Sequence, residues 1–190
     1  SVYGESKYLI ERMLEWFRQT AGLGYTTLRY FNAAGASEQL GEDHDPETHL
    51  IPIVLDVAAG NRDSISIYGD NYPTADGTCI RDYIDVRDLA QAHLLAAEAL
   101  KPGSGNAYNL GSGQGFSVRE VIEMCAQVTG ADIRVEVGPR RPGDPAVLVA
   151  DSGRIERELG WKRKHTTLED TVSAAWLWKV SHPYGYDARQ

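Results

Sequence analysis

Two residues near the start of the chain could act together as an acid/base pair. Tyr3 and Lys7 stand four positions apart in a stretch with helical spacing, which places them one turn apart on the same face. A free phenol has a pKa of about 10 and is a weak base at neutral pH, but a neighbouring ammonium group favours its deprotonated form. The pair could therefore remove a proton from a substrate hydroxyl. Many helices carry Tyr and Lys at this spacing, so the pair alone does not identify an enzyme.

Two arginines could recognise an anionic substrate. Arg81 and Arg141 are basic residues in polar segments of the chain. The planar guanidinium group matches the geometry of phosphate oxygens, so both residues could neutralise a diphosphate. An isolated arginine more often forms a surface ion pair that contributes little energy, and this alternative stays open.

Two further motifs favour simpler interpretations. Residues 111–115 (GSGQG) follow a predicted strand and precede a predicted helix, but their spacing is not G-x-G-x-x-G and no phosphate-loop lysine follows. We therefore expect a tight turn there. Residues 42–49 (EDHDPETH) contain histidine and carboxylate side chains, which are common metal ligands, but in spacings that match no recognised site. For this loop we expect a solvated acidic segment and no bound metal.

Composition excludes several classes of partner. The chain has 190 residues and a formal net charge of −8, which argues against nucleic acid or an anionic membrane as the main partner. No apolar run approaches the roughly 18–20 residues that span a bilayer, and no signal peptide is visible. Cys79 and Cys125 form no C-x-x-C pair, so we expect reduced thiols in a cytoplasmic protein.

Strand and helix patterns alternate along the chain and predict the framework that positions these side chains. Apolar residues at helical spacing predict a helix over residues 4–21, and later helices are predicted to be capped at Asp85, Ser117 and Thr166. Segments rich in β-formers predict strands over residues 25–31, 64–68, 79–84, 107–110, 133–137 and 147–150. This alternation is typical of an α/β fold with parallel strand pairing.

Five segments of the chain share one resemblance. They are YGESK at 3–7, LRYFNAAGA at 28–36, YPTADGTCIRDYIDV at 72–86, PRRPGD at 139–144 and HPYGY at 182–186. Together they resemble the UDP-glucose 4-epimerases, a group within the extended short-chain dehydrogenase/reductase family. The resemblance covers essentially the whole chain. Its most specific part is the segment 72–86, because related decarboxylases and dehydratases usually lack it.

This resemblance implies a fold and a division of the chain. It implies the C-terminal part of a Rossmann-type NAD-binding domain in residues 1–35 and 79–116, joined to a smaller mixed α/β UDP-sugar-binding lobe in residues 36–78 and 117–190. Family members carry a Gly-rich NAD-binding turn and a catalytic Ser or Thr upstream of the catalytic Tyr. We therefore expect this chain to be part of a longer enzyme and inactive alone, and its helix 4–21 to form a homodimer.

The resemblance also implies roles for individual residues. Tyr3 is the catalytic base and Lys7 supports it, while Tyr3, Lys7 and Tyr30 contact NAD. The residues implied to bind the UDP-sugar are Asn32, His49, Leu50, Tyr68, Arg81, Tyr83, Arg141, Asp144 and Leu148. Within this set, the two arginines approach the diphosphate and Asp144 the ribose hydroxyls. Leu148 either lies beside the hexose, where it leaves more room than a Tyr for N-acetylated sugars, or simply packs in its strand.

The implied activity is the interconversion of UDP-glucose and UDP-galactose by transient NAD-dependent oxidation at C4, a reaction of galactose metabolism. Two alternatives stay open. One is a related nucleotide-sugar epimerase or decarboxylase, for instance one acting on UDP-N-acetylglucosamine or UDP-glucuronate. The other is a non-catalytic UDP-sugar-binding module.

Overall fold

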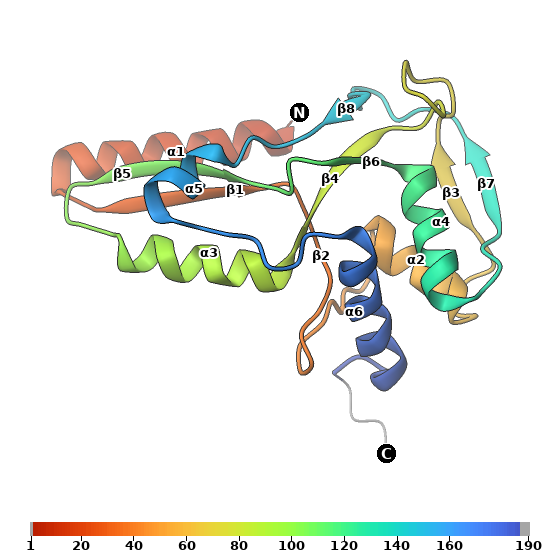
Figure 1. Ribbon diagram of the computed structural model, residues 1–190. Helices are drawn as coiled ribbons and strands as arrows, with labels where there is room; N and C mark the ends of the chain where they lie inside the picture. The colour runs from red at the N-terminus through yellow and green to blue at the C-terminus, as the bar shows by residue number, and fades with distance from the viewer. Residues whose placement is uncertain (1, 187–190) are drawn as a thin grey trace.

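The computed structural model describes residues 2–186 and shows two connected parts built from alternating helices and strands (Figure 1). The helices are α1 (Val2–Ala21), α2 (Leu50–Ala58), α3 (Val86–Glu98), α4 (Val118–Thr129), α5 (Gly153–Leu159) and α6 (Leu168–Ser181). The strands are β1 (Tyr25–Tyr30), β2 (Asn32–Ala34), β3 (Ile65–Tyr68), β4 (Ile80–Asp85), β5 (Gly105–Leu110), β6 (Gly115–Ser117), β7 (Val135–Gly138) and β8 (Val147–Leu148). Within the described residues, no helix is long and apolar enough to cross a membrane.

Parallel pairing dominates the sheets. Strand β1 pairs with β5, β2 with β4, β3 with β7 and β8 with β4, all in parallel. The short strand β6 pairs with β4 in the antiparallel direction. The α/β class with parallel strands, predicted from the alternation of patterns, is therefore confirmed.

The first part is built on the β1–β5 pair. In Figure 1, α1 and α3 lie on opposite sides of this pair. Its core contains Leu89 of α3 and Leu110 of β5, and also Ile155 of α5 and Trp161 just beyond it. The sequence assigned residues 117–190 to the other part of the chain, whereas Ile155 and Trp161 are fully buried in this core. We attribute this packing to the apolar face of the short helix α5, which contacts β5.

The second part closes around its own core. Helix α4 packs on both α2 and α6, and the pair β3–β7 lies beside them. Val54, Leu55, Val121 and Val172 are almost completely buried between these helices. Cys125 lies in the same core, and burial raises the pKa of its thiol to about 12. Both cysteines are free, in agreement with the predicted reduced thiols.

Helix starts follow the predicted capping residues with one difference. The Asp85 carboxylate accepts a hydrogen bond from the Arg87 N–H at 2.9 Å, and Ser117 forms the predicted capping box at the start of α4. The prediction of Thr166 as the cap of the last helix was wrong. Thr167 caps α6 instead, because its extended backbone directly precedes the first helical residue and its hydroxyl accepts from the Asp170 N–H at 3.1 Å.

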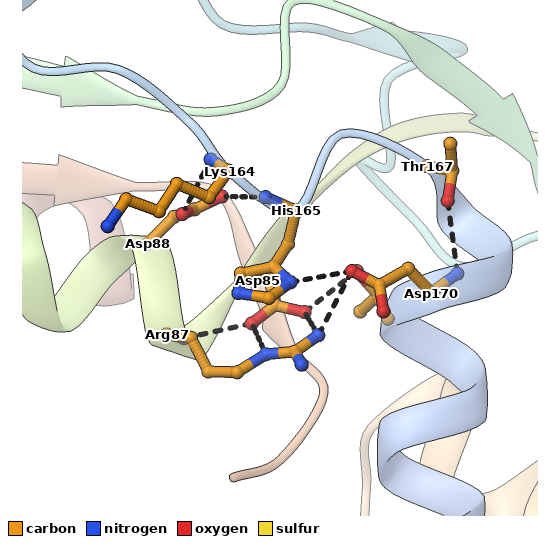
Figure 2. A network of polar contacts seen from close by, with 8 residues as sticks. Asp85, Arg87, Asp88, Lys164, His165, Thr167 and Asp170 are labelled. Carbon is orange, nitrogen blue, oxygen red and sulfur yellow. Dashed lines mark hydrogen bonds and ion pairs between the residues drawn. The ribbon is translucent and has the colours of Figure 1, made fainter.

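A polar network connects the two parts (Figure 2). The buried Asp85 carboxylate accepts two hydrogen bonds from the Arg87 guanidinium, both at 2.8 Å, and one from the Thr171 hydroxyl at 3.0 Å. Asp170 lies 3.3 Å from Arg87 and 2.6 Å from the ring of His165. Partial burial alone would raise the pKa of Asp170, but its hydrogen bond with His165 and the nearby Arg87 charge lower it. This network fixes the start of α3 against α6.

Candidate functional site

A cavity of about 210 Å³ opens between the end of β2, one face of β4, strand β3 and the start of α2. Strands β2 and β4 are neighbours with Asn32 opposite Tyr83, so the cavity lies where both strands run side by side. The Asn32 side-chain amide donates to the backbone carbonyl of Asp82 at 2.7 Å, which holds this residue at the cavity wall.

Alternation along β4 places three side chains on the cavity side. Cys79, Arg81 and Tyr83 all line the cavity, as expected for every second residue of an extended segment. The Arg81 guanidinium donates to the Asp144 carboxylate at 2.5 Å and to the backbone carbonyl of Ile80 at 2.7 Å. Burial raises the pKa of Tyr83, so its phenol stays protonated. The cavity wall therefore combines a fixed cation with a neutral hydroxyl group.

A second cation lies against an aromatic ring at the same cavity. The Arg141 guanidinium carbon lies 3.9 Å from the centre of the Tyr68 ring, in cation–π geometry. Both residues line the cavity. The neighbouring Arg140 instead lies 4.0 Å from the Tyr72 ring and donates to Asn71 at 2.5 Å, and it does not line the cavity. Only one of these adjacent arginines is therefore positioned to meet a ligand in the cavity.

The start of helix α2 forms a further wall of the cavity. His49 is the N-cap residue, and both His49 and Leu50 line the cavity. The first N–H groups of a helix lack partners within the helix and carry a partial positive charge, which favours bound anions. Together with Arg81 and Arg141, this helix end gives the cavity the electrostatic character of an anion-binding site.

The structure brings most of the predicted substrate residues together. Eight of the nine predicted residues line this cavity, namely Asn32, His49, Leu50, Tyr68, Arg81, Tyr83, Arg141 and Asp144. The ninth, Leu148, lies on β8 opposite Arg81 in the parallel register and is half-exposed, but it is not part of the cavity wall.

The predicted catalytic pair lies outside the cavity, on the surface of α1. Tyr3 is 72% exposed, and the Lys7 ammonium lies 5.2 Å from the centre of its ring. Because a short connection joins the end of α1 to the start of β1, the first turn of α1 lies at the carboxyl end of β1. Tyr30, the last residue of β1, is half-exposed at that same end. Nucleotides bind α/β folds at the carboxyl ends of their strands.

Other residues of the cavity wall escaped the sequence prediction, among them a hydroxyl and a thiol. Ser66 and Cys79 both line the cavity, and the Cys79 sulfur lies 3.7 Å from the Asp144 carboxylate. Each stands two positions before a residue that the sequence did single out, Tyr68 and Arg81 respectively. The two-residue period of a strand is therefore the signal that could have found them.

The turn at residues 111–113 is closed by a buried acid. The Asp82 carboxylate accepts hydrogen bonds from the N–H and hydroxyl of Ser112, both at 2.6 Å, and from the Gly113 N–H at 3.0 Å. A side chain at Gly111 would meet the Asp82 carboxylate at 2.5 Å. The N–H groups of Ser112 and Gly113 are thus engaged by Asp82, and that of Gly111 by the Ser152 hydroxyl, which agrees with the predicted tight turn and not with a phosphate-binding loop.

These features define a class of protein: an α/β chain with a Tyr/Lys pair at the carboxyl end of its first described strand and a cavity lined by two arginines and the start of a helix. Residues 1–111 match the family described as the NAD dependent epimerase/dehydratase family. This match covers more than half of the chain, and the chain belongs to that family.

Particular relatives within the family are also evident. The chain is 56% identical over 187 residues to a UDP-glucose 4-epimerase of Halalkalibacterium halodurans, and 52% identical over 188 residues to one of Streptomyces lividans. These alignments cover 97% and 98% of this chain. The solved structure of the Bifidobacterium longum UDP-glucose 4-epimerase in complex with NAD+ and UDP superposes with a TM-score of 0.91 at 39% identity, over 97% of this chain. The chain spans 56% of the length of each of these three proteins.

Proposed function

We propose that this chain provides the UDP-sugar site and the acid/base pair of a UDP-glucose 4-epimerase, which interconverts UDP-glucose and UDP-galactose with NAD as the hydride carrier. The observation that carries the proposal is the convergence of Arg81, Arg141 and the start of α2 on one cavity. Relatives with that printed name, 47–56% identical to this chain, support the choice of substrate.

The cavity suits a nucleoside diphosphate joined to a sugar. In this proposal Arg81 and Arg141 neutralise the two phosphates, and Tyr68 lies beside the nucleobase. Asp144 accepts hydrogen bonds from ribose hydroxyls while its other contact, with Arg81, keeps it in place. A ligand held by its diphosphate leaves the hexose free to turn over, which an epimerase needs.

In this proposal Tyr3 and Lys7 carry out the proton transfer. Lys7 favours the phenolate form of Tyr3, which takes the proton of the sugar 4-hydroxyl and, as the neutral phenol, later returns it to the same oxygen. When bound, NAD would accept the hydride from C4 and give it back to either face of the 4-keto sugar. Tyr3, Lys7 and Tyr30 fit such a cofactor because all three are exposed at the carboxyl end of β1, next to the parallel partner β5.

We also propose the division of the chain into a cofactor-binding and a substrate-binding part, as the sequence resemblance implies. Residues 1–35 and 79–116 form the cofactor side, and residues 36–78 and 117–190 form the substrate side, with α5 packed across onto the first core. Helix α1 is proposed to form a homodimer. This is supported by the large apolar side chains that α1 leaves exposed, namely Tyr8, Leu9, Ile10, Met13, Trp16 and Phe17.

Two measurements test the proposal. The first follows the conversion of UDP-galactose to UDP-glucose by the protein expressed from its own complete gene. No turnover with either sugar, in a protein that binds UDP, would favour a non-catalytic binding module. UDP-N-acetylglucosamine and UDP-glucuronate, assayed in parallel, test whether the protein acts on a different nucleotide sugar.

The second measurement is the affinity for UDP by calorimetry in matched arginine variants. Arg141→Ala removes a charge-assisted contact worth about 1.5–3 kcal/mol, so the dissociation constant should rise roughly 10- to 150-fold. Arg140→Ala, which removes an equal charge from the adjacent position outside the cavity, should change it far less. Equal effects of both variants would show that only the local charge matters and not the cavity.

A further inference from the structure

The loop before α2 gathers four potential metal ligands. Glu42, His44, Glu47 and His49 each offer one ligand atom, and these four atoms all lie within 4.8 Å of one another. The spacing in the sequence suggested only a solvated acidic loop. We propose that this loop binds one zinc ion through these four side chains, at a site distinct from the catalytic pair.

The distances between the imidazole nitrogens and the carboxylate oxygens are close to those around a tetrahedral ion. The His49 Nδ1 lies 2.5 Å from the Glu42 Oε1 and 3.1 Å from the Glu47 Oε1, while the His44 Nδ1 lies 3.0 Å from the same Glu42 oxygen and 3.8 Å from the Glu47 Oε2. An ion with tetrahedral bonds of about 2.0–2.2 Å holds its ligand atoms roughly 3.3–3.6 Å apart. The observed separations lie on both sides of this range, so small side-chain rotations complete the geometry.

Charge provides a second argument. The side chains of Glu42 and Glu47 are only 20% and 12% exposed. Among residues 2–186, their ion-pair partners are the two histidines, and neither carboxylate meets a Lys or Arg. Two partly buried carboxylates beside two imidazoles attract a divalent cation, which neutralises the charges of both carboxylates.

The ligand types select the kind of ion. Magnesium and calcium prefer sites made of oxygen ligands alone, whereas zinc accepts two imidazole nitrogens and two carboxylate oxygens in a tetrahedron. This mixed set also distinguishes the loop from an ordinary acidic loop, which offers only carboxylates.

The loop is held in place at both ends. Near its start, the Tyr186 hydroxyl bonds to the backbone of Gly41 in both directions at 2.9 Å, and the Asp43 carboxylate accepts the Tyr186 N–H at 3.0 Å. At its other end, the Glu47 carboxylate accepts the His49 N–H at 2.7 Å, and His49 begins α2. An ion bound here would therefore fix the start of α2, which forms a wall of the substrate cavity.

The test measures zinc binding directly, without any nucleotide sugar, so it does not depend on the proposed epimerase activity. Purified protein is stripped with a chelator and titrated with Zn²⁺ while bound metal is counted by mass spectrometry. We expect one tightly held equivalent, which millimolar Mg²⁺ does not displace. Co²⁺ in place of zinc should give the intense visible absorption of a tetrahedral site.

Matched variants decide whether the loop is the site. Glu42→Gln and His44→Ala remove one ligand each and should weaken zinc binding at least about 100-fold, the upper range seen when only a supporting contact is lost. Glu38→Gln and His93→Gln change the same residue types at exposed positions outside the loop and should leave binding unchanged. Circular dichroism confirms that each variant is folded.

Two outcomes would overturn the proposal. One is stripped protein that retains no stoichiometric zinc after titration and desalting. The other is equal zinc affinity in the loop variants and in the control variants, which would assign the metal to scattered surface histidines. As an independent readout, zinc should raise the Tm of the unaltered protein and not that of His44→Ala, because a ligand that binds only the folded state stabilises it.

Discussion

Helices α1 and α2, one from each part of the molecule, differ in how many of their residues are buried. Helix α2 has nine residues, and four of them are buried in the core of the second part. Helix α1 has twenty residues, none of them buried. Trp16 and Phe17 of α1 remain more than half exposed, although the sequence of the helix carries apolar residues at helical spacing.

The difference shows that helical spacing of apolar residues predicts a helix but not what covers it. In the second part, α4 and α6 pack against α2 and complete its core. On α1 the large apolar side chains are exposed, and exposed apolar side chains grouped on one element mark an interaction site. We propose a second copy of the chain as its partner. Substitutions in each part can separate the role of α1, which carries the proposed catalytic pair, from the role of the second part, which has its own closed core.

The largest expected effect concerns the exposed pair. Tyr3→Phe removes the phenolic oxygen and should lower kcat roughly 10²- to 10⁴-fold, the usual contribution of a positioned acid/base. The dissociation constant for UDP should stay unchanged, because Tyr3 lies outside the cavity. The measurement compares kcat from a coupled assay with UDP affinity from calorimetry.

Tyr8→Phe is the control, since it removes the same hydroxyl five residues further along α1. Near-normal turnover in Tyr3→Phe would make Tyr3 a residue of the helix start only. Loss of UDP affinity together with kcat would place it in the binding site.

The next effect separates the two parts by stability. Leu55→Ala opens a space in the closed core and should lower the free energy of unfolding by about 2–5 kcal/mol. Leu9→Ala, on the half-exposed face of α1, should change it by less than about 0.5 kcal/mol in dilute, monomeric protein. Urea unfolding of both variants gives the comparison. A large cost for Leu9→Ala in the monomer would mean that the face of α1 is already covered.

The sequence predicted the helices and strands better than it predicted the cavity wall. Local signals were sufficient for the elements, since the caps at Asp85 and Ser117 and the helix over residues 4–21 follow from nearby residues alone. Eight residues of the cavity wall were predicted because they stand in segments that resemble a known family. Ser66 and Cys79 were missed although strand periodicity places both on the cavity side.

Other features depend on contacts distant in the sequence and gave no local signal. The short helix α5 carries Ile155 into the first core, and its sequence does not indicate which core it joins. The convergence of His44 and His49 on two carboxylates depends on the path of the loop backbone. The single-residue shift of the last cap, from Thr166 to Thr167, reflects two adjacent residues of equal capping ability.

A smaller effect tests the proposed partner of α1. Trp16→Glu places a charge on the exposed apolar face and should weaken self-association by about 2 kcal/mol or more, roughly 30-fold, as expected for an aromatic anchor of an interface. Sedimentation over a range of protein concentrations measures this. Leu94→Glu, on the exposed side of α3, is the control and should leave association unchanged. A chain that stays monomeric at every concentration would contradict the homodimer.

The smallest effect is the pH dependence of the contact between α1 and β1. Hydrogen bonds from Arg18 and Gln19, and a further one from Tyr25 on β1, lower the pKa of Glu15 from its ordinary 4.5 to about 2. Because the folded state holds the charged form more strongly, Glu15 stabilises the protein fully above pH 4.5, and this stabilisation is lost as the pH falls toward 2. Glu15→Gln should therefore be less stable than the unaltered protein at neutral pH, with a difference that shrinks through that window. Salt should reduce the difference, since these groups are exposed to solvent.

Thermal unfolding at a series of pH values measures the effect, with Glu98→Gln as the control variant. A stability difference that persists unchanged at pH 2 would show that Glu15 acts through packing and not through its charge.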